Sequence, residues 1–153
     1  MIEKIEELQE SKNCYIIDYL PMTILGQEYF EIEKFFLKNY IKDFSKKIVN
    51  IVVKLIGYYD AQIYLTESYK IQSLYPIGQN IRNQSLFKIA EIISYIIEND
   101  TSSVQVIFNT SPYFLISING GFSIAIYNTS EEQRQLLNAL VTQENLFFRP
   151  CPE

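Results

Sequence analysis

The chain has 153 residues, a hydrophobic fraction of 48% and a formal net charge of −5. This length suits one domain with a single core, and the apolar content excludes a largely disordered chain. The negative charge opposes binding to nucleic acid or anionic membrane, which requires clustered Lys and Arg. No apolar run approaches the ~20 residues that span a bilayer, and the charged N-terminus is unlike a secretion signal. These features predict a cytoplasmic protein that binds neither nucleic acid nor membrane.

The first third of the chain predicts a helix, a strand and two further helices. Residues 2–10 have helical spacing of apolar side chains, and Cys14–Asp18 reads as a short strand. A helix is expected from Gln27, with a break near residues 43–45. The next helix, 46–56, has too broad an apolar stripe to face solvent, and Gly57 is its expected stop. This helix is therefore predicted to be central in the fold or to lie at an interface.

The middle of the chain alternates between strand and helix patterns. Period-2 alternation over residues 58–66 and a weaker return over residues 69–75 predict a hairpin spanning 58–75. A strong apolar stripe over residues 84–98 predicts a helix. The sequence therefore supplies at least one hairpin and one amphipathic helix ahead of the most regular strands.

Residues 104–127 predict a meander of three strands at the centre of the sheet. Asn119-Gly120 is a typical sequence for a tight hairpin with positive φ values. Both faces of the later strands are apolar, so the sheet must be covered on both sides, or on one side and by another subunit. Ser130 and Gln133 form a capping-box pattern ahead of a helix over 131–143, and a last strand follows near residues 146–148.

Together these elements predict a single α+β domain over residues 1–153. Its sheet is expected to be mixed but mostly antiparallel, with the meander 104–127, the hairpin 58–75 and four or so packed helices.

The usual catalytic and nucleotide-binding motifs are missing from the sequence. The chain contains no histidine, which excludes Ser-His-Asp and Cys-His constellations and the common zinc sites. It contains no glycine-rich phosphate loop. Cys14 and Cys151 are expected to be free thiols in a reducing compartment, with a staple between the chain ends as the alternative. We therefore expect no cofactor, no metal and no catalytic residue.

The segment from Asp18 to Tyr29 is an apolar loop of a kind that lines a pocket or an interface. The alternative is that it simply packs over the sheet. Glu28, Glu31 and Glu33, with Asp18 nearby in sequence, could form an acidic cluster that binds a hard cation or acts as acid and base. Glu28 and Glu31 share a helix face, and the alternative is an ordinary solvated first turn. The candidate ligand-binding or partner-binding residues are Asp18, Tyr19, Gln27, Tyr29 and Glu31.

Two functions follow from these observations. The first is a non-enzymatic interaction domain, for example a bacterial immunity-type or regulatory protein that blocks a basic partner. A homodimer through helix 46–56 or a sheet edge would cover excess apolar surface. The alternative is a domain that binds a small ligand, or is weakly catalytic, through carboxylates near residues 18–31.

Overall fold

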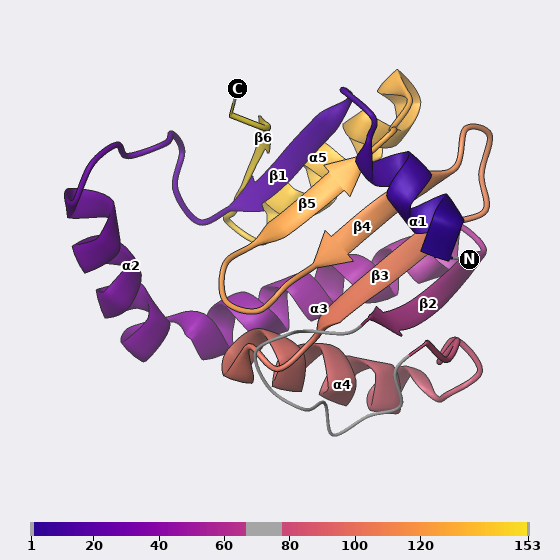
Figure 1. Ribbon diagram of the computed structural model, residues 1–153, viewed down its shortest axis with the longest axis horizontal. Helices are drawn as coiled ribbons and strands as arrows, with labels where there is room; N and C mark the ends of the chain where they lie inside the picture. Colours follow the sequence, from indigo (N-terminus) through magenta and orange to yellow (C-terminus); the bar gives the residue numbers. More distant parts are fainter. Residues whose placement is uncertain (1, 67–77, 153) are drawn as a thin grey trace.

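The predicted meander forms the middle of a six-stranded antiparallel sheet in the computed structural model, which describes residues 2–66 and 78–152 (Figure 1). Along the sheet the strands follow the order β2-β3-β4-β5-β1-β6. Their bounds are β1 Cys14–Asp18, β2 Ala61–Thr66, β3 Ser103–Phe108, β4 Phe114–Ile118, β5 Ile124–Tyr127 and β6 Phe147–Pro150. The α+β class is confirmed, and every strand pair among the described residues is antiparallel.

Helices cover both faces of this sheet, which confirms the expectation from its two apolar sides. Their bounds are α1 Ile2–Gln9, α2 Glu28–Asn39, α3 Ile41–Tyr58, α4 Leu86–Asn99 and α5 Glu131–Gln143. Figure 1 shows α3 passing behind the sheet, α4 below it in the view, α1 in front, and α2 standing apart at the left. The main core joins α3, α4 and α5 to one sheet face, while Ile5 and Leu8 of α1 pack on Ile107 and Leu115 of the other.

Helix α3 occupies the centre of the core, as predicted. Nine of its residues are buried, so its apolar stripe is covered within the chain itself. The predicted bounds were wrong, however. The helix begins at Ile41, and Gly57 lies inside its last turn rather than stopping it.

The break between α2 and α3 lies at Tyr40 and not at residues 43–45. Tyr40 has φ −132°, which interrupts the helical conformation, and it caps both helices. Its ring packs among other aromatic side chains. Tertiary packing therefore sets the position of the bend. The capping pattern of Asp43 and Ser45 carries no information about that packing, so it predicted the bend at the wrong residues.

The turn after β4 is longer than the predicted Asn-Gly hairpin. The amide of Asn119 donates to the carbonyl of Ser123 across the connection (3.0 Å), and the positive φ falls on Gly121. The returning half of the predicted hairpin, residues 69–75, lies outside the described residues.

The two cysteines form a disulfide, so the expectation of free thiols is wrong. Cys14 begins β1 and Cys151 follows β6, and the two Cα atoms are 5.4 Å apart. The amide of Cys151 also donates to the carbonyl of Cys14 (2.9 Å). Strand pairing between β1 and β6 brings the chain ends together, although the cysteines are 137 residues apart. Free thiols would have been consistent with a reducing compartment, and the disulfide removes that argument.

Candidate binding cleft beside helix α2

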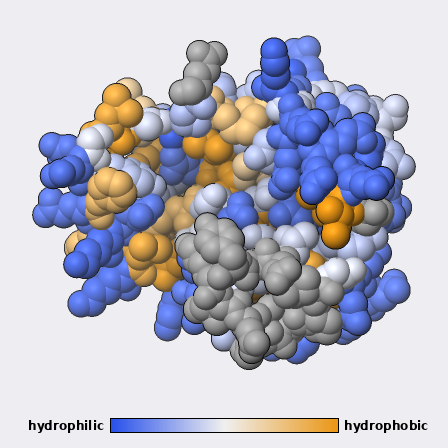
Figure 2. Space-filling model, viewed as in Figure 1, coloured by the Kyte–Doolittle hydropathy of each residue, from blue (hydrophilic) through white to orange (hydrophobic). Residues whose placement is uncertain are grey.

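Helix α2 and the loop before it, residues 20–39, form an arm that projects from the body (Figure 1). None of the twelve residues of α2 is buried. A helix that is apolar on several sides is normally buried, so this exposure is unusual. Large apolar side chains remain exposed along the arm, namely Met22 (67%), Leu25 (82%), Phe30 (68%), Phe35 (60%) and Leu37 (40%). In Figure 2 apolar side chains gather at the left, over the arm.

A cluster of aromatic rings fixes the base of the arm to the body. The ring of Tyr19, just beyond β1, lies 5.2 Å from that of Phe36 in α2 and 4.3 Å from that of Phe122 in the β4–β5 loop. The ring of Phe44 in α3 lies 4.9 Å from that of Phe122. Tyr40, at the bend, packs against the same rings. The arm is therefore held at its base by ring packing between segments that are far apart in the sequence.

A cleft of about 490 Å³ lies between the arm and the body; we call it the arm cleft. Residues of α2 form one wall, and the end of β1, the β4–β5 loop and the end of α4 form the other. The lining residues are Ile16, Ile17, Asp18, Tyr29, Glu33, Leu37, Ile97, Glu98, Asp100, Gly120, Gly121, Phe122, Ser123, Ile124 and Ala125. The cleft thus combines an apolar surface with carboxylates from three separate parts of the fold.

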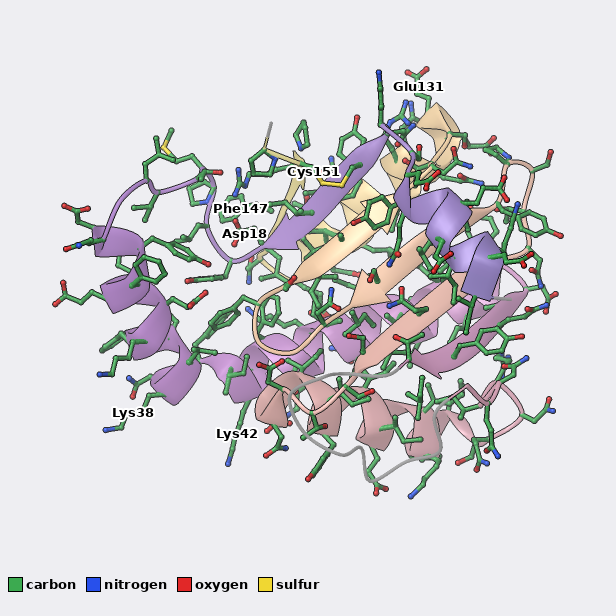
Figure 3. All side chains as sticks on the ribbon, viewed as in Figure 1. Asp18, Lys38, Lys42, Glu131, Phe147 and Cys151 are labelled. Carbon is green, nitrogen blue, oxygen red and sulfur yellow. A yellow bond between two sulfur atoms is a disulfide. The ribbon has the colours of Figure 1, made fainter. Side chains whose placement is uncertain are left out.

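The charge of the arm cleft is one-sided. Four lining residues carry a carboxylate, and no Lys or Arg is among the described residues that line it. Asp18 is already paired with Arg149 of β6, which also donates to the hydroxyl of Thr23 (3.2 Å). Figure 3 shows Asp18 at the end of β1 that faces the arm. Glu33 and Glu98 add further negative charge to the lining of the cleft.

Two of these carboxylates are held by neutral donors. The hydroxyl of Tyr29 donates to Glu33 (2.9 Å), and the hydroxyl of Ser45 donates to Glu98 (3.2 Å). Among the described residues, neither Glu33 nor Glu98 belongs to an ion pair. Each is therefore oriented but keeps its charge for a cation that enters the cleft.

The tyrosines beside the cleft are kept protonated. Burial, together with the hydrogen bond and charge of Glu33, raises the pKa of Tyr29 far above its usual range. Burial and the nearby charge of Asp18 also raise the pKa of Tyr19. At neutral pH both rings therefore act as neutral surfaces and not as bases.

The candidate residues chosen from the sequence occupy three different places. Asp18 and Tyr29 line the arm cleft, and Tyr19 lies behind it in the aromatic cluster. Gln27 and Glu31 are exposed and do not line it. Gln27 stands at the N-cap of α2 without a capping hydrogen bond from its side chain.

Sequence reasoning included Asp18 and Glu33 in its candidate acidic cluster and missed the other two cleft carboxylates, Glu98 and Asp100. Leu37 follows Tyr29 and Glu33 at four-residue spacing, so the helical period could have placed it on the same side of the helix. Glu98, Asp100 and the 120–125 segment have no local signal that links them to Tyr29, because only the sheet order brings them together.

The described residues give no sign of a metal centre or of a membrane helix. Within residues 2–66 and 78–152, no three His, Cys, Asp or Glu side chains are placed to hold a metal ion. No helix in the same ranges is long and apolar enough to cross a membrane. No protein-family model matches the chain, and no curated protein or solved structure matches it. The geometry of the arm cleft is therefore the main evidence on function.

Proposed function

We propose that the chain is a non-enzymatic interaction domain whose arm cleft binds a basic segment of a partner protein. The observation that supports this most is the one-sided charge of the cleft, in which Glu33 and Glu98 lack ion pairs among the described residues. An Arg or Lys side chain would place its charge between these carboxylates and its aliphatic stem on the apolar surface.

The arm favours a peptide over a small cation. Leu37 lines the cleft and is 40% exposed, and Phe30 lies two turns earlier on the same flank of α2. These side chains would pack against the residues next to the inserted cation. Apolar contacts beside a charged anchor would let the cleft recognise the neighbouring side chains of a peptide as well as the single cation. A domain of this kind matches the predicted immunity-type or regulatory role, and its location in the cytoplasm stays a prediction.

The test is titration of a short fluorescent peptide rich in arginine and leucine, followed by anisotropy. We expect saturable binding that weakens with salt, since exposed charges are screened. Glu33→Gln combined with Glu98→Gln keeps both hydrogen-bond acceptors and should weaken binding roughly tenfold, at ~0.5–1 kcal/mol for each exposed pair.

The matched control makes the same change of charge far from the cleft. Glu131→Gln combined with Glu10→Gln alters two exposed residues, and Figure 3 shows Glu131 at the top of the view, away from the arm. Equal weakening by both double variants would mean non-specific attraction and would contradict the proposal. Binding of arginine amide as tight as that of the peptide would instead support the small-ligand alternative.

A further inference from the structure

The outer side of α2 carries a second pattern that the arm cleft does not use. Lys42 lies beyond the bend at Tyr40, in the first turn of α3. Glu28, Glu31, Phe35 and Lys38 follow one another within α2 at spacings of three, four and three residues. This spacing places them along one side of a helix. The cleft residues Tyr29, Glu33 and Leu37 lie on the opposite side, by the same helical period.

This side of the helix is free of the rest of the molecule. Glu28, Glu31, Phe35, Lys38 and Lys42 are all exposed, and Figure 3 shows Lys38 and Lys42 pointing away from the body. Among the described residues, no ion pair includes any of these four charged side chains. The face therefore consists of an exposed aromatic ring with acidic residues before it and basic residues after it.

We propose that two copies of the chain pair through this face, with their α2 helices antiparallel about a two-fold axis at Phe35. In an antiparallel pair, a residue before the two-fold axis on one helix faces the residue about equally far after it on the other helix. Phe35, which lies at the axis, therefore faces Phe35 of the second copy. Glu31 then lies opposite Lys38 of the second copy, and the two-fold axis repeats this pairing.

The complementarity singles out a second copy as the partner. The acidic half of each helix meets the basic half of the other, and antiparallel helix dipoles add to the attraction. A buried aromatic side chain covers ~150–250 Å², so the exposed fraction of Phe35 gives roughly 90–150 Å² of apolar surface on each copy. A standard interface buries ~800 Å² per partner, so the dimer should form weakly and depend on concentration.

The experiment measures molar mass by sedimentation over a series of concentrations. The wild-type mass should rise toward that of a dimer with concentration. Glu31→Lys alone and Lys38→Glu alone each oppose like charges across the pair, and each should remain monomeric over the same range.

An equimolar mixture of the two variants should regain the dimer. The lysine introduced at position 31 of one chain then meets the glutamate introduced at position 38 of the other. The two-fold related contact joins the native Lys38 of the first chain to the native Glu31 of the second, so both contacts are attractive again. Rescue by mixing therefore distinguishes the proposed pairing from a general effect of either charge change.

Control variants carry the same reversals elsewhere. Glu91→Lys on α4 and Lys12→Glu before β1 change exposed residues and should associate like the wild type. A wild-type chain that stays monomeric at every concentration overturns the proposal. So does a dimer that is indifferent to Glu31→Lys and Lys38→Glu, or a mixture that stays monomeric. Because Glu31 does not line the arm cleft, peptide binding and pairing can fail independently.

Discussion

At the scale of single residues, the hydroxyl of Tyr29 in α2 interacts directly with a carboxylate of the arm cleft. Tyr29 donates to Glu33 one turn further along α2, so the pair orients a carboxylate toward the cleft. Burial and the same carboxylate both oppose ionisation of the phenol and raise its pKa. A tyrosinate beside Glu33 would place two like charges in one partly buried site.

Stability should therefore fall in alkaline solution because of Tyr29. Its pKa is raised in the folded protein, so the unfolded chain releases this proton first, from about pH 10. As pH rises above that value the unfolded state is favoured. Tyr29→Phe should make the alkaline loss of stability less steep, as measured by urea unfolding at several pH values.

The control for this experiment is Tyr58→Phe, because Tyr58 is 65% exposed and lies outside the cleft. Its alkaline slope should match that of the wild type. If Tyr29→Phe and the wild type lose stability equally with rising pH, the burial of the Tyr29 hydroxyl in the arm cleft is contradicted.

At the scale of elements, the β4–β5 loop packs closely on the end of α4 and forms one edge of the cleft. The amide of Gly121 donates to the carbonyl of Ile97 (3.0 Å). A Cβ at Gly120 would clash with the backbone and side chain of Asp100, which itself adopts a left-handed conformation with φ 51°. Glycine is needed at position 120 for this close approach of two backbones.

Gly120→Ala should therefore destabilise the protein by about 1–3 kcal/mol, a typical result of overpacking. Gly57→Ala is the matched comparison, because a Cβ there meets nothing within 4 Å and the residue is helical. It should stabilise the protein by about 0.5–1 kcal/mol through helix propensity. Urea unfolding of the two variants checks both signs. A neutral effect of Gly120→Ala would contradict the close packing of this loop on α4.

Elements with strong local signals could be predicted from the sequence. Strand β1 has the predicted bounds, and α5 begins with the predicted capping box of Ser130 and Gln133. The bend at Tyr40 could not be predicted, because it depends on rings contributed by the end of β1, by α3 and by the β4–β5 loop. Part of the cleft could be predicted from the sequence, since Asp18 and Tyr29 are near each other in the chain. Its opposite wall depends on strand order, which no local pattern encodes.

At the scale of the whole molecule, α2 separates two surfaces of different character. Its inner side faces an acidic cleft, and its outer side carries Phe35 between acidic and basic residues. A basic partner and a second copy could therefore be bound at the same time, without competing for the same side chains. The base of the arm must hold both surfaces in place, and it is joined to β1, which the disulfide links to the end of β6.

The disulfide should contribute strongly to stability because it closes almost the entire chain into a loop. Cys14 and Cys151 are 137 residues apart, and in the chain-entropy account a loop of this size stabilises by about 4–5 kcal/mol. Cys14→Ser combined with Cys151→Ser should lose about this amount in urea unfolding. Reductant should lower the unfolding midpoint of the wild type and leave the double variant unchanged.

Alkylation followed by mass measurement provides the direct check of the pairing. Denatured wild-type protein should incorporate no label unless it is first reduced, after which both cysteines should react. Label on both cysteines without reduction would show free thiols and contradict the pairing. In that case β6 would be held to β1 by its ladder, by the stacked rings of Tyr15 and Phe148 and by the Asp18–Arg149 pair. Because cytosolic proteins rarely keep structural disulfides, persistence of the bond would also favour an oxidising compartment over the predicted cytoplasm.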